Sequence, residues 1–263
     1  MRLSVITMAY KEPYLNQTLT SLLENSELGD QLEIIVTLDS YWPAHDMIQD
    51  PRVRYIHFGA NRGPKECFNT AYKIARGEFV MRLDCHCMFG KGYDRILCDD
   101  CGDKDVITAR RYFLDPVKWE RMDIEPVDYE KLVIQDMKKF SGSRWESRAK
   151  ERKDIMVDET MAMQGSMWVT SKKWFELICG GRLQTEGYGP AYQDSTEVSM
   201  KSWVNGGRLM VTKNTWFAHK HRSFPRNHQE GTEENPWKAE ESWLFALNEW
   251  IDFYPTIKQR FNL

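Results

Sequence analysis

The sequence lacks the features that would place a protein in a membrane or in the secretory pathway. No apolar run approaches the ~20 residues that a membrane-spanning helix needs. The first residues enter a strand-like run at once, without the long apolar segment and small-residue cleavage site of a signal peptide. We therefore expect a cytoplasmic protein with no membrane span.

The sequence also has no large excess of charge of either sign. Its 36 Lys and Arg residues nearly balance 39 Asp and Glu residues, which gives a net charge of −3. This excludes a globally basic protein, and binding of a polyanion would need a local basic patch. With 263 residues, of which 41% are hydrophobic and 29% charged, the composition excludes a disordered or fibrous chain. We predict a single domain over residues 1–263.

The six cysteines of a cytoplasmic chain are expected to be reduced thiols and not a disulfide framework. Four of them lie close together, and a Cys-x-x-Cys pair can supply two thiolate ligands to zinc. A zinc site is therefore an open alternative, although we favour buried, metal-free thiols. The four residues are Cys85, Cys87, Cys98 and Cys101.

Strands and helices are predicted to alternate in the first third of the chain. Short apolar runs are separated by segments with helical spacing of their apolar residues. This order is typical of a parallel sheet covered by helices, in which ligands bind at the carboxyl ends of the strands. Asp39 and Asp84 each directly follow such a strand. The predicted strands are residues 3–9, 33–38, 53–58 and 78–83.

The remainder of the sequence is less regular. The highly charged residues 114–160 are predicted to form a solvated helix or a mobile loop, with an acceptor-facing loop as the alternative. Ser171 is predicted to cap a helix over residues 172–178, which Gly180 ends. Further strands are predicted at 106–109, 161–170 and 208–212, a helix at 194–205, and a packing helix at 237–254. That last helix is expected to carry Trp243, Leu244, Leu247, Trp250 and Ile251 on one face.

The segment Asp84-Cys85-His86 carries the most informative side chains. A carboxylate and an imidazole one residue apart, just past the end of a strand, can both face one bound cation. An oxygen ligand together with a nitrogen ligand suits Mn²⁺ or a similar divalent ion. The pattern is short, so its meaning depends on the surrounding sequence.

Residues 75–87, which contain this Asp-x-His, resemble the metal-binding segment of polypeptide N-acetylgalactosaminyltransferases and related family 2-like GT-A glycosyltransferases. Residues 165–175 resemble that family's glycine-containing acceptor-side strand and the helix after it. Residues 194–207 are similar to its Glu-Asn-x-Glu-x-Ser helix with a Gly-Gly end. Residues 219–222 fall where the family has His-x-x-Arg, and residues 243–254 resemble its last helix. The similarity therefore spans nearly the whole chain in the right order.

The resemblance implies a GT-A fold, an α/β Rossmann-like fold with a mainly parallel central sheet flanked by helices. It implies a nucleotide sugar, usually a UDP-sugar, as donor, and Mn²⁺ or Mg²⁺ as cofactor. Asp84 and His86 would bind the metal, with His219 as the third protein ligand. Arg222 would bind the diphosphate, and Asp194, which replaces the family's Glu, would bind sugar hydroxyls or orient the acceptor hydroxyl.

The resemblance also implies which residues contact the donor. Asp39 would lie near the uridine, and Ala9 and Tyr10 would line the base pocket. The family's Arg-rich helix start is here Pro64-Lys65, so Lys65 is the candidate for a basic contact to the diphosphate. The full set of expected donor contacts is Ala9, Tyr10, Asp39, Lys65, Leu83 and Gly165.

Two further consequences follow from the resemblance. Residues 1–110 would form the nucleotide-sugar-binding half, and residues 111–263 the acceptor-binding half with the C-terminal helix. The sequence shows no membrane anchor, stem or lectin domain, so a secretory-pathway role on mucin-like proteins is not expected. Residues 191–193 depart from the family's Trp-Gly-Gly, which leaves the sugar open.

One long stretch, residues 198–229, contains no acidic residue. It has more positive charge than one diphosphate needs, and aromatic residues are interleaved with the basic ones. A groove of this kind could hold nucleic acid, and an enzyme acting on a hydroxyl-modified base would have to flip it out of the duplex. A basic face that balances an acidic remainder is the alternative. The basic residues are Lys201, Arg208, Lys213, Lys220, Arg222 and Arg226.

We therefore predict a Mn²⁺-dependent, retaining glycosyltransferase that moves a hexose or N-acetylhexosamine from a UDP-sugar to a hydroxyl of a macromolecule. Hydroxyl-modified DNA bases, proteins and polysaccharides remain open as acceptors, and the oligomeric state is open. A nucleotide-sugar-binding module without catalysis is an alternative of another class. A nucleotidyltransferase is disfavoured because residues 8–12 do not form a glycine-rich phosphate loop.

Overall fold

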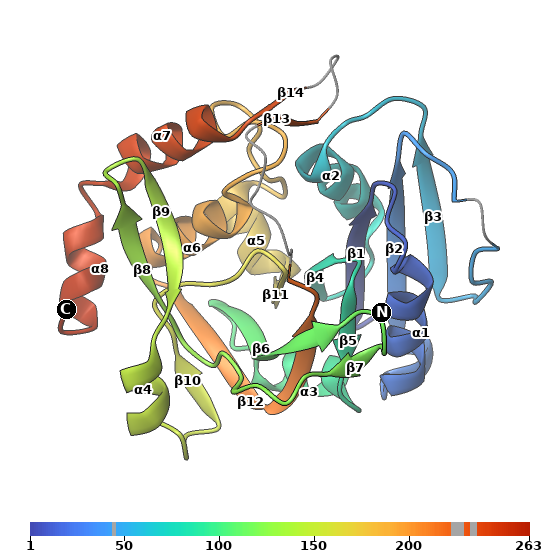
Figure 1. Cartoon of the computed structure of the whole chain (residues 1–263), viewed down its shortest axis with the longest axis horizontal. Coiled ribbons are helices and arrows are strands. Elements are labelled where there is room, and N and C mark those ends of the chain that lie inside the picture. The colour runs from blue at the N-terminus through green and yellow to red at the C-terminus, as the bar shows by residue number, and fades with distance from the viewer. Residues whose placement is uncertain (44–45, 222–228, 232–235) are drawn as a thin grey trace.

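A computed structural model describes residues 1–43, 46–221, 229–231 and 236–263, and it has a ten-stranded sheet at its centre (Figure 1). The strands of this sheet are β1 (Leu3–Ala9), β2 (Leu32–Asp39), β3 (Val53–Phe58), β4 (Phe79–Asp84), β5 (Cys87–Phe89), β6 (Asp105–Asp115), β7 (Glu120–Arg121), β10 (Val157–Glu159), β11 (Met167–Ser171) and β12 (Arg208–His219). They are ordered β10-β12-β6-β11-β4-β1-β2-β3, with β5 paired to β12 and β7 to β6. The first and second halves of the chain therefore share one sheet.

The sheet is parallel on one side and mixed on the other. Strands β4, β1, β2 and β3 are parallel neighbours, as the alternation of apolar strands and helices predicts. Strand β11 lies between β4 and β6 and is antiparallel to both, while β12 is parallel to β6. The predicted α/β sheet flanked by helices is confirmed. Because β4, β6 and β12 run in the same direction, their carboxyl ends lie at the same edge.

Helices cover both faces of this sheet. They are α1 (Leu15–Asn25), α2 (Pro64–Ile74), α3 (Tyr93–Asp100), α4 (Glu146–Glu151), α5 (Lys172–Cys179), α6 (Asp194–Val204), α7 (Ala239–Trp250) and α8 (Tyr254–Arg260), with a 3₁₀ turn η1 (Gly29–Gln31). Successive residues of a strand face opposite sides, so Val5 and Ile6 of β1 belong to two different hydrophobic clusters. The Val5 cluster contains residues of α1 and α3, and the Ile6 cluster contains residues of α2, α5 and α6.

The charged segment 114–160 differs from its prediction as a solvated helix or mobile loop. Strands β8 (Glu130–Gln135) and β9 (Lys139–Arg144) form an antiparallel hairpin, which stands beside α6 and α7 in Figure 1. The hairpin is ordered by its few apolar side chains, because Leu132 and Phe140 are buried in the main core. The sequence did not predict these strands, because their few apolar residues lie among many charged ones.

The helix ends follow local rules better. Ser171 accepts a hydrogen bond from the backbone N–H of Trp174, and Gly180 ends α5 with a left-handed φ of 63°, so both predicted caps are confirmed. The predicted C-terminal helix is interrupted, since α7 ends at Trp250 and α8 begins at Tyr254 with a proline in its first turn. Leu244 is 45% exposed, which contradicts its placement on the packing face.

None of the helices in the described ranges has both the length and the apolar character to cross a membrane.

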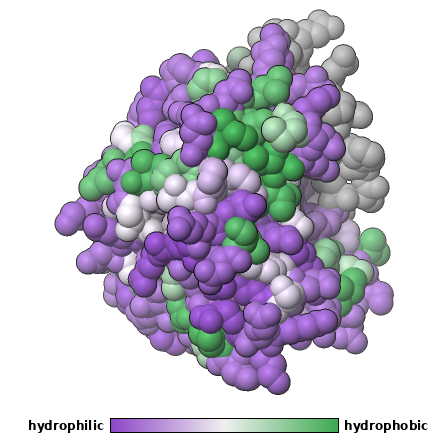
Figure 2. Space-filling view, turned by 90° about the vertical axis from the view of Figure 1, so that its left-hand side faces the viewer, coloured by the Kyte–Doolittle hydropathy of each residue, from purple (hydrophilic) through white to green (hydrophobic). Residues whose placement is uncertain are grey.

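Figure 2 shows the side of the molecule that lies at the left of Figure 1. This side is mostly hydrophilic, with hydrophobic residues gathered in its upper half. The last short hairpin, β13 (Gln229–Gly231) with β14 (Pro236–Lys238), precedes α7.

Candidate metal and active site

Three predicted metal ligands meet at the carboxyl edge of the sheet. Asp84 is the last residue of β4, His86 lies in the short connection to β5, and His219 is the last residue of β12. Strand β5 pairs with the end of β12, and the backbone N–H of Lys220 donates to the carbonyl of His86 at 3.1 Å. This pairing brings together two histidines that are far apart in the sequence.

The donor atoms of these residues face one another. Asp84 Oδ2 lies 3.3 Å from His219 Nε2 and 4.0 Å from His86 Nε2, and the two imidazole rings are 4.9 Å apart between centroids. All three ligand atoms lie within 4.8 Å of one another. Both ring nitrogens of His219 are shielded from solvent; Nε2 faces the Asp84 carboxylate, and Nδ1 has no hydrogen-bond partner among the described residues. Two imidazoles and a carboxylate that face one another in this way fit a divalent cation of the Mn²⁺ type.

The protonation of these side chains also suits a metal. Burial lowers the pKa of His219 to about 4, so its ring is neutral at physiological pH, as a metal-ligating imidazole must be. For Asp84, burial acts to raise the pKa, but the positive charge of Arg82 and the contacts with His219 and His86 together outweigh burial and hold the pKa well below its usual range. Asp84 is therefore an anion that can bind a cation.

Arg82 is a component of the site that the sequence did not reveal as one. It precedes Asp84 by two residues on β4, so both side chains point to the same face of the sheet. Its guanidinium donates to Asp84 Oδ1 and to the carbonyl of Gly165, and its Nε lies 3.0 Å from Asp194 Oδ2. The residue is 7% exposed. A charged residue within an otherwise apolar strand was the available signal.

Asp194, predicted to bind the sugar or the acceptor, thus lies next to the metal ligands. It begins α6 and is 8% exposed. A Cβ at position 165 would lie 3.4 Å from Asp194 Oδ1, so Gly165 lies directly against this carboxylate. The structure brings Asp84, Gly165 and Asp194 together around Arg82.

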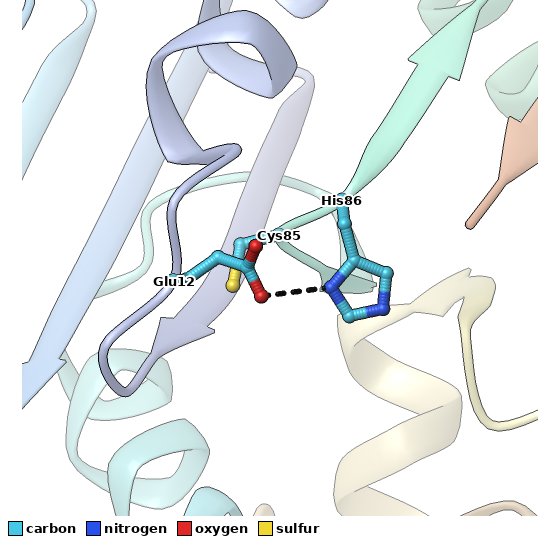
Figure 3. A group of neighbouring side chains, drawn as sticks. All are labelled: Glu12, Cys85 and His86. Carbon is cyan, nitrogen blue, oxygen red and sulfur yellow. Dashed lines mark hydrogen bonds and ion pairs between the residues drawn. The ribbon is translucent and has the colours of Figure 1, made fainter. Parts of the chain in front are cut away.

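A second component without a clear sequence signal is Glu12. Its Oε2 lies 2.9 Å from Nδ1 of His86 (Figure 3). The other ring nitrogen, Nε2, is the one that faces Asp84. The two residues are 74 positions apart, and nothing in the local sequence pattern links them. Only the neighbouring positions of β1 and β4 in the sheet bring them together.

Asp39 lies at the end of β2, as predicted, but its carboxylate is already engaged. It accepts hydrogen bonds from Asn61 Nδ2 at 3.0 Å and from the backbone N–H groups of Arg62 and Gly63 at 2.7 and 2.9 Å. These contacts fix the turn that precedes α2. A contact of Asp39 with a uridine stays a prediction.

Of the other residues predicted to contact the donor, some are exposed and some are buried. Tyr10 is 37% exposed and packs edge-on against Tyr41, with ring centroids 6.3 Å apart, while Ala9 is fully buried at the end of β1. Leu83 is fully buried and faces the side of the sheet opposite to Asp84. Its side chain is therefore turned away from the site, and a donor contact through its backbone stays a prediction.

The prediction for Lys65 is wrong, because this side chain is only 1% exposed. Its Nζ donates to the carbonyl of Gln184 at 2.9 Å, lies 3.4 Å from Glu197 Oε2, and lies 4.4 Å from the ring centre of Tyr188. It is a buried charge that ties α2 to α6 and cannot serve as a diphosphate contact. Arg222 lies outside the described residues.

The predicted burial of the cysteines is confirmed, whereas their being free of metal stays a prediction. All six are free and buried. Within the described ranges, neither Cys98 nor Cys101 belongs to a group of three or more ligand side chains. Burial raises the pKa of Cys98 to about 12, which opposes the thiolate form that zinc requires.

Three of the basic residues in the described part of the acid-free stretch are engaged within the fold. Lys213 is 6% exposed and donates to the carbonyls of Arg152 and Lys153, Arg208 forms an ion pair with Asp105, and Lys201 forms one with Glu197. Arg222 and Arg226 lie outside the described residues. Three of the six basic residues of the stretch therefore have partners within the fold.

Comparison with known proteins agrees with this geometry. The sequence profile described as glycosyl transferase family 2 matches residues 4–178. The chain therefore belongs to glycosyl transferase family 2, and the resemblance to these enzymes noted in the sequence is confirmed.

Two curated relatives are polypeptide N-acetylgalactosaminyltransferase 12 of Mus musculus and of Homo sapiens. The mouse protein is 25% identical over 78% of this chain and 37% of its own length. The human protein is 24% identical over 94% of this chain and 44% of its own length. The chain thus spans less than half the length of these relatives.

Solved structures share the fold. GalNAc-T7 with UDP, GalNAc and Mn²⁺ superimposes with a TM-score of 0.73 at 15% identity, covering 97% of this chain and 50% of the other. S. aureus TarS 1–349 in complex with UDP-GlcNAc gives a TM-score of 0.55 at 16% identity, covering 86% of this chain and 60% of the other. The predicted GT-A fold is confirmed.

Proposed function

We propose that the chain transfers a hexose or N-acetylhexosamine from a UDP-sugar to a hydroxyl of a macromolecular acceptor, with retention of the anomeric configuration. The observation that carries this proposal is the convergence of Asp84, His86 and His219 at the carboxyl edge of the sheet, with Nε2 of each histidine facing the carboxylate. The likeness to structures that contain UDP, GalNAc and Mn²⁺, or UDP-GlcNAc, supports the donor class and the metal.

The residues of the site have distinct roles in this proposal. Asp84, His86 and His219 would hold Mn²⁺ or Mg²⁺, which when bound neutralises charge on the departing diphosphate. Asp194 hydrogen-bonds sugar hydroxyls or orients the acceptor hydroxyl. In the reaction, the bond between the sugar C1 and the diphosphate oxygen breaks, the acceptor oxygen bonds to C1, and the acceptor's proton leaves with UDP. Arg222 is proposed to contact the diphosphate on the basis of its sequence motif alone.

The acceptor is proposed only as a hydroxyl of a macromolecule. A nucleic-acid acceptor was suggested by the basic residues between positions 198 and 229. Lys201, Arg208 and Lys213 are engaged within the fold, so the described part of this stretch gives little support to a polyanion groove. Protein and polysaccharide hydroxyls are the alternative acceptors.

A panel of UDP-sugars with and without Mn²⁺ tests the proposal. We expect one donor to give UDP in an Mn²⁺-dependent manner, with faster release when a suitable acceptor is added, and no release in excess chelator. Mass spectrometry of protein, glycan and modified-DNA acceptors then identifies the product. Pyrophosphate release would indicate nucleotidyl transfer, and donor binding without UDP release with any acceptor would indicate a binding module.

Two variants show whether the activity belongs to this site. Asp84→Asn should abolish the Mn²⁺-dependent release, because the cation loses its only carboxylate among the three proposed ligands. Asp103→Asn is the matched control, since Asp103 is exposed and precedes β6 at the opposite edge of the sheet. Full activity of Asp84→Asn would contradict the proposed metal site.

A further inference from the structure

The contact between Glu12 and His86 joins two loops at the carboxyl edge of the sheet. Strands β1 and β4 are parallel neighbours, with Met8 opposite Asp84, so the segments that follow them lie side by side. Glu12 Oε2 lies 2.9 Å from His86 Nδ1, and Figure 3 shows the carboxylate directed at this nitrogen. Their side chains are 15% and 20% exposed, so solvent screens the contact only partly.

The Glu12 carboxylate is held in place by its own loop. Its second oxygen, Oε1, accepts a hydrogen bond from the backbone N–H of Tyr14 at 3.1 Å. The backbone N–H of Glu12 in turn donates to the hydroxyl of Tyr41 at 3.3 Å. Because both ends of Glu12 are anchored, its contact with His86 has a fixed direction.

This direction decides which nitrogen of His86 is free. A neutral imidazole has a proton on one nitrogen and a lone pair on the other, and a metal binds the lone pair. A carboxylate at Nδ1 requires the proton there. The lone pair is then on Nε2, which is the nitrogen that faces Asp84 Oδ2 at 4.0 Å.

We propose that Glu12 is a positioning residue for the metal site: it holds His86 in the Nδ1–H tautomer and orients Nε2 toward the cation. This inference rests on the proposed function, because it presupposes a cation between Asp84, His86 and His219. Hydrogen bonds from metal-ligating histidines to carboxylates orient the ring and raise its basicity, and their loss typically lowers metal affinity by about 10- to 100-fold.

The same side chains allow a different interpretation, in which Glu12, Cys85 and His86 hold a second metal ion. The contacts favour a direct hydrogen bond between Glu12 and His86 over a metal ion bound between them. The distance of 2.9 Å from Glu12 Oε2 to His86 Nδ1 is the usual length of an N–H···O hydrogen bond. The Cys85 thiol donates to the carbonyl of Met8 at 3.1 Å, so its sulfur retains its proton.

Titration with Mn²⁺ in the presence of UDP, followed by the EPR signal of free Mn²⁺, tests the proposal on the full chain. Glu12→Ala should weaken Mn²⁺ binding by at least about tenfold. Glu12→Gln should lose less, because its amide oxygen can still accept the proton of Nδ1. Cys85→Ser is the matched control and should bind Mn²⁺ as the unaltered protein does. A loss in Cys85→Ser equal to that in Glu12→Ala would overturn the proposal in favour of a second metal site.

The variant His86→Ala separates this inference from the proposed function. If His86→Ala binds Mn²⁺ as tightly as the unaltered protein, the proposed metal site itself is wrong. If His86→Ala loses affinity and Glu12→Ala does not, only the role of Glu12 is overturned.

A spectroscopic readout covers the case in which Glu12→Ala does not fold. In ¹⁵N-histidine-labelled protein without metal, the resonances of His86 are assigned by their loss in His86→Ala. We expect the Nδ1–H tautomer in the unaltered protein and in Glu12→Gln. A folded Glu12→Ala should shift toward the Nε2–H tautomer. Finding Nε2–H as the main form in the unaltered protein would overturn the proposal.

Discussion

Arg82 Nε lies 3.0 Å from Asp194 Oδ2, and the same guanidinium donates to Asp84 Oδ1. One buried cation therefore connects the carboxylate of the proposed metal site with the carboxylate proposed to face the sugar. Because Arg82 occupies Oδ1 of Asp84, it leaves Oδ2 directed at the two histidines. Arg82, a buried residue of β4, therefore orients the carboxylates of both Asp84 and Asp194.

Replacement of Arg82 by methionine should destabilise the protein strongly. The variant leaves the buried Asp194 and the partly exposed Asp84 near each other without a counter-charge. Breaking a buried ion pair on one side, as for Asp194, costs about 3–5 kcal/mol. We expect the free energy of unfolding in urea to fall by this amount. Added Mn²⁺ should restore part of the loss, since a bound cation supplies positive charge to Asp84.

Arg95→Met is the control for this experiment. Arg95 forms an ion pair with Glu27 in which both side chains are well exposed, and solvent screens such pairs so that they contribute little to stability. A loss in Arg82→Met no larger than that in Arg95→Met, or one unaffected by Mn²⁺, would show that Arg82 does not link the two carboxylates as described.

Reversal of the charge at Lys213 should affect stability and not acceptor binding. Its Nζ donates to the carbonyls of Arg152 and Lys153 at 2.6 and 3.2 Å, so Lys213→Glu places an anion against two carbonyl oxygens. We expect a loss of at least about 3 kcal/mol in the free energy of unfolding. Lys213→Met, which keeps the buried chain and removes the charge, should lose less. A stable Lys213→Glu protein with reduced salt dependence of acceptor binding would instead support a polyanion groove.

The sequence allowed the parallel strands to be predicted, and it pointed to Asp84 and His86 as candidate metal ligands, because both follow local rules. Apolar runs, helix caps and the Asp-x-His at a strand end are each read from a few neighbouring residues. The roles of Lys65 and Arg82 could not be read in this way. The ammonium group of Lys65 is buried beside the carboxylate of Glu197, which is 132 positions away in the sequence. The guanidinium of Arg82 is buried beside the carboxylate of Asp194. Long-range charge pairing has no local pattern.

The reversed strand and the charged hairpin were missed for a related reason. Strand direction is not encoded in an apolar run, so the antiparallel β11 could not be distinguished from a parallel strand. In the hairpin, Leu132 and Phe140 are the buried positions of two short strands with many charges. These two apolar positions are recognised as strand positions only once the structure shows both side chains packed in the core.

Glu33 should give the protein a pH-dependent stability that is separate from the active site. Burial acts to raise its pKa, but hydrogen bonds from Ser4 and Arg76 and the charge of Arg54 outweigh burial and lower it. A lowered pKa means that the ionised carboxylate stabilises the fold at neutral pH. This contribution begins to fall below the unfolded-state pKa of about 4.3, and it is lost as the pH falls through the lower folded-state pKa.

Urea unfolding of the unaltered protein and of Glu33→Gln at several pH values tests this expectation. At neutral pH the variant should be less stable by about 1–3 kcal/mol, because hydrogen bonds to a charged group are lost. The difference should be constant down to about pH 5 and should shrink below about pH 4. A difference that grows on acidification would contradict the lowered pKa. Glu33 lies at the start of β2, at the edge opposite to Asp84, so the activity per folded molecule should not change.

The proposed retention of configuration predicts an α-linked product from the α-linked UDP-sugar. An inverting transfer needs a carboxylate base opposite the leaving group to take the acceptor's proton, and removal of such a base costs about 10²- to 10⁴-fold in rate. Asp194 is the residue that would have to act in this way. Its Oδ2 faces Arg82 and its Oδ1 lies against Gly165, a setting that favours a positioning role.

Asp194→Asn should therefore lower the transfer rate by only about tenfold, equivalent to about 1.4 kcal/mol. The anomeric proton coupling of the product, measured by NMR, decides between the two mechanisms. A β linkage, together with a loss of more than about a thousandfold in Asp194→Asn, would identify Asp194 as the base of an inverting enzyme.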